Sequence, residues 1–386
     1  MCFSNRILYV RFLPDSFVYL IIFIAIIVYL SKYSIQLIHL SKFNFVCISL
    51  LASIWLYDQF WLNGNNLISI GGTLLRIICA AIIIVSSRND KYHLLDLLVL
   101  TIQIIVGIAI IGWIAFLFKF PLPHYTDTSD AFYTHTIYYI FNLNGLPELQ
   151  LLPRFAGPFL EPGHLGTMCI FLLYLRDFKI KNIGNLILLI AVLLSLSLAA
   201  YGLMIIAIII TLYNKRKYAA CLTMFGLFGL SAMLATYYNG GDNPINQAIV
   251  ARLEVNDNGE IAGNNRTSRA FDAAYEKFLK SNEILFGQGR KAYGVRGDGS
   301  DNITIGCATY KRYFFLRGII GSSLMILFLL LYLLKFENKR SIGFFIIYIV
   351  ANCIRDYPSM EMWLFTYLLG VPLIGQSHKL LNRSIH

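Results

Sequence analysis

The stretch RFAGPFLEPGH at residues 154–164 places ionisable side chains directly before an apolar segment. Glu161 and His164 are three residues apart, and Arg154 lies shortly before them. A carboxylate and an imidazole can transfer a proton when burial and neighbouring charges tune their pKa values. The alternative is a turn that begins a helix, in which Arg154 and Glu161 neutralise each other, since Pro162 suits a first helical turn. The composition leaves both interpretations open.

A second set of chemically competent residues lies at the start of an expected helix within residues 264–280. Apolar residues recur there at helical spacing, and Asn265 or Thr267 could cap the helix. Arg266 and Arg269 would then share one side of its N-terminal end.

Arginines at that position favour an anionic ligand, because a helix N-terminus already carries partial positive charge and free N–H groups. Arg266 and Arg269 therefore suggest a phosphate site. The alternative is that both are solvated or paired with Asp272 and Glu276. The spacing does not separate these two possibilities.

The elements that must position these residues are transmembrane helices. The 386-residue chain is 57% hydrophobic and 14% charged, far from the roughly 25% charged residues of soluble domains. Its apolar runs are continuous rather than alternating, which excludes a β-barrel, and many approach the roughly 20 residues that a membrane-spanning helix needs. The net charge of +11 serves membrane orientation, so we expect no nucleic-acid partner.

The predicted fold class is all-α: a polytopic integral membrane protein with about eleven transmembrane helices, in the range of roughly ten to twelve. Residues 184–213 contain a break at SLSLAAYG, which predicts a tight hairpin or a broken helix. The expected spans are residues 14–31, 43–61, 67–87, 94–120, 164–177, 184–198, 200–213, 218–237, 313–335, 341–354 and 361–375.

Short basic connections orient these spans. By the positive-inside rule, the segments rich in Lys and Arg face the cytoplasm. Alternation then places two large loops, residues 121–163 and 238–312, on the external face of a single transmembrane domain over residues 1–386. The cytoplasmic segments are residues 86–93, 176–182, 213–218, 335–340 and 377–386.

Four motifs in this arrangement resemble those of bacterial O-antigen polymerases of the Wzy type. They are R-F-x-G-x-F-x-E-P-G at 154–163, R-T-S-R-A-F at 266–271, I-L-F-G-Q-G at 284–289 and L-R-G-I-I-G at 316–321. The likeness in topology covers most of the chain, whereas the residue matches are confined to these motifs.

This resemblance implies an inverting glycosyltransferase with a GT-C-like fold in the bacterial inner membrane, with its active site facing the periplasm. The implied substrate is an undecaprenyl-diphosphate-linked oligosaccharide repeat. Membrane lipids and a chain-length regulator are further implied partners. The resemblance implies no metal and no cofactor.

The chemistry of such a transfer assigns roles to particular residues. The leaving group is a lipid diphosphate, which guanidinium groups bind in bidentate fashion. We expect Glu161, or else His164, to accept the proton of the attacking hydroxyl. Tyr310 and Lys311 are candidate sugar contacts. The candidate diphosphate ligands are Arg154, Arg266 and Arg269, with Arg290 and Arg312 in reserve.

Two other classes of function compete with polymerisation: an O-antigen ligase or another lipid-linked sugar transferase, and a polysaccharide transporter or flippase. Related O-antigen ligases carry a His in the long loop shortly before the span that here begins near 313, but residues 238–312 contain none. A transporter or flippase would bind its substrate near the bilayer midplane, often between internal repeats. The chain shows no repeat between its halves, and Arg76 is the clearest charge within a span.

Overall fold

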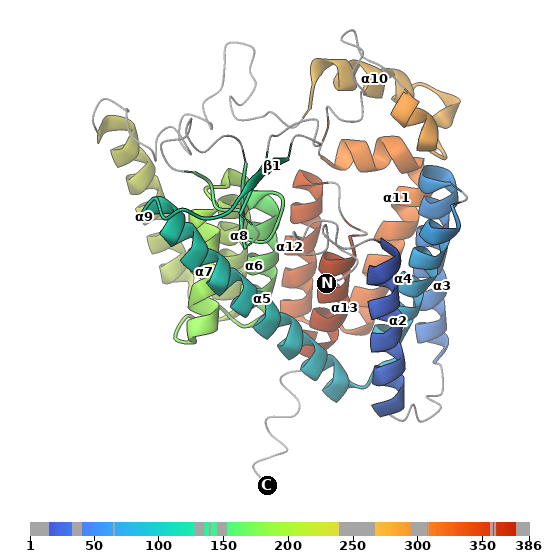
Figure 1. Cartoon of the computed structure of the whole chain (residues 1–386), viewed down its shortest axis with the longest axis horizontal. Helices are drawn as coiled ribbons and strands as arrows, with labels where there is room; N and C mark the ends of the chain where they lie inside the picture. Colours follow the sequence, from blue (N-terminus) through green and yellow to red (C-terminus); the bar gives the residue numbers. More distant parts are fainter. Residues whose placement is uncertain are drawn as a thin grey trace. The chain divides into compact units, whose positions relative to one another are not determined.

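A computed structural model gives the arrangement of the chain (Figure 1). The structure describes residues 15–32, 41–64, 66–127, 135–138, 140–144, 153–238, 267–294, 307, 309–355, 358 and 360–375.

Most of the described chain is helical, and a helix lies at each of the predicted spans. The long apolar runs produce these helices, because in a membrane every backbone polar group must be satisfied within the segment. The helices are α2 (Asp15–Lys32), α3 (Lys42–Asp58), α4 (Leu67–Val85), α5 (Arg88–Leu117), α6 (Pro162–Leu175), α7 (Ile183–Leu194), α8 (Leu198–Asn214), α9 (Tyr218–Tyr237), α10 (Arg269–Leu279), α11 (Tyr310–Lys335), α12 (Lys339–Ile354) and α13 (Glu361–Gly375).

Length and composition identify some of these helices as membrane spans. Among the described residues, 4 helices are long and apolar enough to cross a bilayer. They cover Lys42–Asn63, Leu67–Val85, Arg88–Leu117 and Tyr310–Lys335, and several shorter apolar helices accompany them. The chain is therefore a helical membrane protein.

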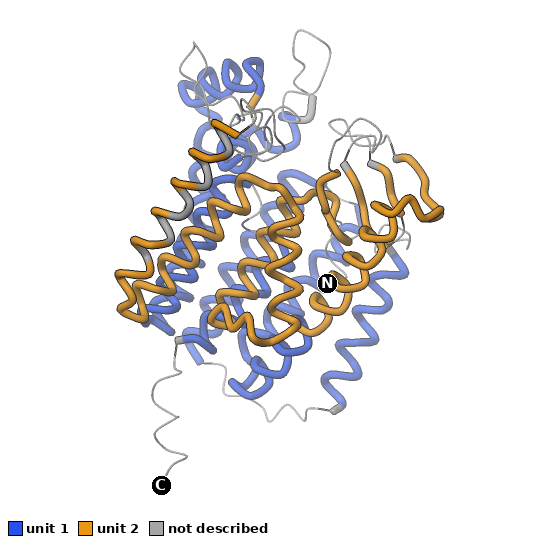
Figure 2. Tube along the Cα trace, turned by 90° about the vertical axis from the view of Figure 1, so that its left-hand side faces the viewer, with its two compact units in different colours: residues 1–98, 268–386 blue, residues 99–267 orange. Residues whose placement is uncertain are grey.

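The chain divides into two compact units, coloured separately in Figure 2. Unit 1 contains residues 1–98 and 268–386, and unit 2 contains residues 99–267. The division falls inside α5.

In unit 1, α3 packs against α4 and α11, and α13 packs against α4 and α12. An ion pair between Arg76 of α4 and Glu361 of α13, with 2.9 Å between Nε and Oε1, links two of these helices. Buried tyrosines also join helices: Tyr332 donates a hydrogen bond to the carbonyl of Leu368 at 2.8 Å. Such a partner is what a buried hydroxyl requires.

Helix α11 is kinked where the motif L-R-G-I-I-G begins. Gly318 has φ 63° and ψ −164°, outside the helical region, and lacks the Cβ that makes a positive φ costly. Figure 1 shows the first turns of α11 running across the end of the unit before the helix turns into the bundle. The kink thus separates Tyr310–Arg317 from the remainder of the span.

In unit 2, α6 is the central helix, and all of its residues are buried. It packs against both α7 and α8. The approach to α8 is close at Gly166, where a Cβ would lie 2.4 Å from the Cβ of Ala200. The break predicted within 184–213 is present: α7 ends at Leu194, α8 begins at Leu198, and Leu196 between them has φ 44°.

Unit 2 also contains a small sheet that the all-α prediction lacked. Strands β1 (Tyr125–Asp127), β2 (His135–Ile137) and β3 (Asn142–Asn144) pair antiparallel in the order β1-β2-β3. The strands are too short to produce the alternation by which a strand is recognised in sequence. The sheet lies in the first of the two predicted external loops.

The short helix predicted in the second loop is present as α10, but its predicted cap is wrong. Ser268 is the N-cap residue, and its hydroxyl accepts a hydrogen bond from the backbone N–H of Phe271 at 3.1 Å. Asn265 lies outside the described residues, and Thr267 precedes the cap. Arg269 is consequently the first residue of the helix.

Candidate functional site

The motif R-F-x-G-x-F-x-E-P-G forms a buried corner that leads into α6. Phe155 forms an isolated bridge with Leu143, the central residue of β3, and donates its N–H to the carbonyl of Leu194 at 3.1 Å. Gly157, with φ 55°, accepts a backbone hydrogen bond from Asn142 at 2.9 Å, and the Asn142 side chain donates to the carbonyl of Leu160 at 2.9 Å. These contacts hold the chain at both sides of the turn that precedes Glu161.

Glu161 and His164 meet at the start of α6. Glu161 has extended backbone angles as the N-cap residue, and Pro162 is the first helical residue. The Nε2 of His164 lies 4.0 Å from the Oε2 of Glu161. The His164 side chain is fully buried, whereas that of Glu161 is 25% exposed. A carboxylate near a helix N-terminus is electrostatically favoured.

Arg154 lies at the break between α7 and α8. Its Nε donates to the carbonyl of Ser195 at 3.4 Å, and its side chain is half-buried. Ser195 is itself buried and forms part of the turn that joins the two helices. The charge of Arg154 is therefore fixed near the point where α7 ends.

In unit 1, α10 lies beside the start of α11. Phe271 and Phe278 of α10 stack edge-to-face on Phe315 of α11, with ring centroids 5.4 Å and 5.0 Å apart. This burial explains the apolar spacing that predicted α10. The hydrophobic cluster under the helix contains Leu62, Phe271, Phe278, Ala292, Cys307, Phe315 and Leu316.

Lys311 is held by α10. Its Nζ lies 2.7 Å from the Oδ1 of Asp272 and 5.7 Å from the centre of the Tyr275 ring. Burial and the neighbouring Tyr310 raise the pKa of Tyr275, and the charge of Lys311 partly offsets that change. Asp272 therefore pairs with Lys311, a residue that the sequence suggested as a sugar contact, while Arg269 is exposed at the start of α10.

The motif I-L-F-G-Q-G docks on the kink of α11. Gln288 donates its N–H to the carbonyl of Phe315 at 2.8 Å, and Ile320 donates to the carbonyl of Leu285 at 3.0 Å. Gly287 has φ 75°, and a Cβ there would lie 2.5 Å from the backbone nitrogen of Gly318. The motifs I-L-F-G-Q-G and L-R-G-I-I-G, which are separate in the sequence, therefore contact each other in the structure.

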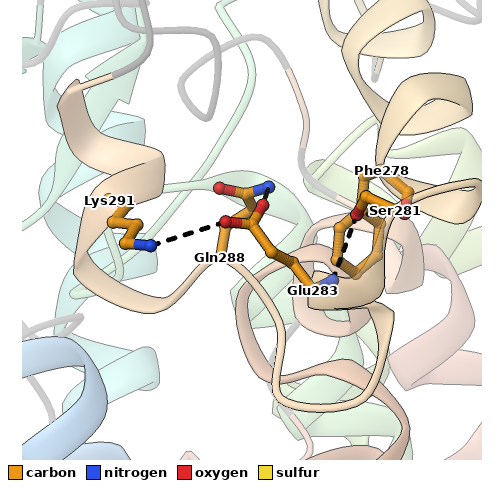
Figure 3. Close-up of polar contacts among 5 residues, drawn as sticks. All are labelled: Phe278, Ser281, Glu283, Gln288 and Lys291. Carbon is orange, nitrogen blue, oxygen red and sulfur yellow. Dashed lines mark hydrogen bonds and ion pairs between the residues drawn. The ribbon is translucent and has the colours of Figure 1, made fainter.

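Side-chain contacts stabilise the same segment from within (Figure 3). The Ser281 hydroxyl donates to the carbonyl of Phe278 at 2.8 Å and accepts the N–H of Glu283 at 3.3 Å. The Glu283 carboxylate accepts a hydrogen bond from Gln288 and lies 3.5 Å from the Nζ of Lys291. Residues 281–294 therefore form an ordered turn that includes the short helices η6 (Asn282–Ile284) and η7 (Gly289–Gly294).

Arg290 lies over the end of η1 (Gln59–Asn63), the π-helical extension of α3. A Cβ on Gly64, whose φ is 80°, would lie 1.3 Å from Nη2 of Arg290, so the guanidinium occupies the space beside this glycine. Arg290 is exposed, Arg312 is half-buried and Tyr310 is 53% exposed.

A charged pair that the sequence did not indicate supports this region. Arg317 forms two hydrogen bonds with the carboxylate of Asp58, and its guanidinium lies 4.1 Å from the centre of the Tyr313 ring. Each residue stands at the end of an apolar run, which is the one signal that could have suggested a pairing. Tyr57 adds a hydrogen bond to the carbonyl of Arg317 at 3.2 Å.

The candidate residues fall into two groups. Arg154, Glu161 and His164 belong to unit 2, where Glu161 and His164 are neighbours. The other group, in unit 1, comprises Arg269, Arg290, Tyr310, Lys311 and Arg312. Arg266 lies outside the described residues. The convergence of arginines from the two loops stays a prediction.

Within the described part of the chain, no three His, Cys, Asp or Glu residues are grouped in a way that could hold a metal ion. No protein-family model matches the sequence, and no curated protein and no solved structure is significantly similar to it. The apolar helices define the chain as a helical membrane protein, and a more specific activity is a matter of proposal.

Proposed function

We propose that the protein polymerises lipid-linked oligosaccharide repeats into a bacterial surface polysaccharide, as O-antigen polymerases do. The observation that carries the proposal is the pair formed by Glu161 and His164. The motif that suggested the function forms a buried corner, and this corner presents a partly exposed carboxylate beside a fully buried imidazole. That arrangement suits a general base next to a lipid-borne substrate.

The proposal includes a location and a topology. The protein spans the bacterial inner membrane with about eleven helices in a GT-C-like arrangement. Its two large loops and its active site face the periplasm. Its substrate is an undecaprenyl-diphosphate-linked oligosaccharide, and membrane lipids and a chain-length regulator are its further partners.

The proposed reaction is an inverting glycosyl transfer. A hydroxyl at the non-reducing end of a new repeat attacks the anomeric carbon of the growing chain, and the bond from that carbon to the lipid diphosphate breaks. The hydroxyl proton passes to the carboxylate of Glu161, with His164 as the alternative base. The bonding electrons leave with the diphosphate, so negative charge develops on the leaving group.

The arginines would stabilise this developing charge. A guanidinium group stays protonated at every relevant pH and matches two phosphate oxygens at once. Arg154, Arg266 and Arg269 are the proposed ligands, with Arg290 and Arg312 in reserve. The exposure of Arg269 at a helix N-terminus supports its role, because such an end favours a bound anion.

The sugar contacts are proposed for the beginning of α11. Tyr310 is exposed there and can stack on a sugar face. Lys311 already pairs with Asp272, so its role would be to hold α10 in place beside the acceptor sugar as much as to contact that sugar.

Polymerisation, unlike transport, does not depend on an ion gradient.

Deletion of the gene in the parent strain tests the proposal, with surface polysaccharide resolved on a gel. We expect the long ladder to disappear while the lipid core with a single repeat remains. Complementation with the intact gene should restore the ladder. Loss of every repeat from the core would instead identify a ligase or a flippase, and an unchanged ladder would refute the proposed activity.

A further inference from the structure

Exposed apolar side chains gather around the end of α3 in unit 1. Tyr57 stacks on Trp61, with ring centroids 6.0 Å apart, and Trp61 contacts Phe286, with centroids 6.3 Å apart. Phe286 is 50% exposed and Leu67 is 82% exposed. We call this surface the outer apolar patch, and it consists of Phe60, Trp61, Leu67, Ile68, Leu285 and Phe286.

The ends of two membrane-spanning helices indicate the depth of this patch in the bilayer. The apolar span Lys42–Asn63 ends just after Trp61, and the span Leu67–Val85 begins at Leu67. Residues 64–66 join the two spans, so both ends lie at the same membrane boundary. Phe60, Trp61, Leu67 and Ile68 therefore stand where the hydrocarbon core meets the headgroups.

The motif I-L-F-G-Q-G is held at that level by direct contact. The hydroxyl of Tyr57, one turn before Trp61, donates a hydrogen bond to the carbonyl of Phe286. A Cβ on Gly289 would lie 2.5 Å from the indole nitrogen of Trp61, so the chain passes closely over the ring. Leu285 and Phe286 thus lie beside the last turns of a membrane span.

The patch continues the lipid-facing side of α4. Leu67, Leu74 and Ile78 are separated by seven and four residues, which places them on one helix face, and each is exposed. An exposed apolar stripe on a membrane span faces lipid acyl chains. Since Leu67 belongs to both the stripe and the patch, lipid is the occupant that covers both.

The charge beside the patch fits the same occupant. Arg290, whose guanidinium lies beside Gly64 at the end of the span, is exposed. Apolar and aromatic anchors flanked by a cation are typical of segments that lie in the bilayer interface, because the cation reaches the lipid phosphates.

We infer that Leu285 and Phe286 insert into the extracytoplasmic leaflet beside Phe60 and Trp61, with Arg290 at the level of the phospholipid phosphates. The external loop would then be anchored to the bilayer at a second point, in addition to the helix that follows it. This membrane contact does not rest on the proposed polymerase activity.

Photo-crosslinking in lipid tests the inference. Full-length protein carrying p-benzoyl-phenylalanine in place of Phe286 is reconstituted into nanodiscs of phosphatidylethanolamine and phosphatidylglycerol, irradiated, and analysed by mass spectrometry. We expect phospholipid adducts at 286, because a benzophenone abstracts hydrogen only from groups in contact with it. Phosphatidylglycerol should be enriched among them, and Arg290→Gln should remove that enrichment.

The same photo-reactive residue at Glu276, which is exposed on α10, is the matched control and should give few lipid adducts. Equal lipid yields at 276 and 286, or crosslinks from 286 to a polypeptide instead of lipid, would overturn the inference. Adducts at 286 without phosphatidylglycerol enrichment would overturn the part assigned to Arg290.

A second measurement uses no modified residue in the loop. The fluorescence of Trp61 is obtained as the difference between the wild-type protein and Trp61→Phe in nanodiscs whose lipids carry bromine at different depths. We expect the strongest quenching from bromines near the headgroup end of the acyl chain. A Trp61 signal that no brominated lipid quenches would contradict the proposed insertion.

Discussion

Arg317 donates hydrogen bonds to the carboxylate of Asp58, which lies 259 residues away in the sequence. Its Nε lies 2.6 Å from Oδ1 and its Nη2 lies 3.0 Å from Oδ2, so the two groups meet in the bidentate geometry that makes such pairs strong. Each side chain is 12% exposed. The pair therefore ties the kink of α11 to the end of α3 within unit 1.

Breaking this pair should destabilise the protein strongly. Asp58→Ala leaves the guanidinium of Arg317 almost buried and without its carboxylate, which typically costs about 3–5 kcal/mol. We expect a clear drop in the midpoint of thermal unfolding of the purified protein in detergent, followed by tryptophan fluorescence.

The matched control removes both charges. Asp58→Leu combined with Arg317→Met should recover a large part of the loss, because most of the penalty comes from the unpaired charge and not from the absence of the pair. If the double variant has the same unfolding midpoint as Asp58→Ala, the unpaired charge of Arg317 is not the cause of the lost stability.

The contact between Gly287 and Gly318 should tolerate no side chain. Both residues have positive φ, and a Cβ on Gly318 would lie 2.4 Å from the nitrogen of Gly287 and 2.6 Å from the carbonyl oxygen of Ile284. Gly318→Ala therefore has to separate the two motifs or strain the backbone, at a cost of about 1–3 kcal/mol for a backbone conformation that is essentially confined to glycine. We expect a lower unfolding midpoint and faster proteolysis of the segment around 284–289.

Gly71 provides the comparison. It lies in α4 with open space around its missing side chain, so Gly71→Ala should leave stability unchanged or raise it by up to about 1 kcal/mol. Equal effects of the two substitutions would show that the docking of I-L-F-G-Q-G on the kink does not contribute to stability.

The sequence predicted the helices well because apolar runs report directly on burial in lipid. The ranges expected for the spans, the break between α7 and α8, and the amphipathic α10 all depend on local spacing. Local spacing was less informative about ends: Ser268, next in the chain to the expected Thr267, is the residue whose hydroxyl caps α10.

Contacts between distant segments could not be read from the sequence. Nothing local in the sequence pairs Asp58 with Arg317, or brings Gly287 against Gly318, because such pairing depends on how the helices pack. For the candidate site, the sequence correctly grouped Glu161 with His164, since they are one helical turn apart. It gave no hint that Lys311 would pair with Asp272.

Glu161→Gln should abolish polymer formation without unfolding the protein. The amide keeps the shape of the carboxylate and cannot accept the proton of a sugar hydroxyl. A positioned general base typically contributes about 10²–10⁴-fold to a rate, so we expect loss of the long polysaccharide ladder on the gel. The amount of protein in the membrane fraction should match the wild type.

Glu337→Gln is the matched carboxylate control. Glu337 is exposed just beyond the C-terminal end of α11 and belongs to none of the four sequence motifs of the proposed site, so the ladder should be unaffected. A wild-type ladder from Glu161→Gln at normal protein abundance would remove Glu161 from the proposed mechanism and leave His164 to be tested as the base.

Arg269→Ala separates function from stability at the proposed diphosphate site. Arg269 is exposed at the first position of α10, and alanine is a good helix former. The free energy of unfolding should therefore change by no more than about 0.5 kcal/mol. A lost hydrogen bond to a charged phosphate costs about 1.5–3 kcal/mol, which corresponds to a rate roughly 10- to 100-fold lower. We expect a shortened or absent ladder, and the same result for Arg266→Ala.

Lys280→Ala is the matched control. Lys280 is an exposed cation at the opposite end of the helix, so its replacement should leave the ladder intact. If both arginine variants retain full ladders, the phosphate ligands lie elsewhere; if Lys280→Ala fails as well, the effect reflects the general charge of α10 and not a specific site.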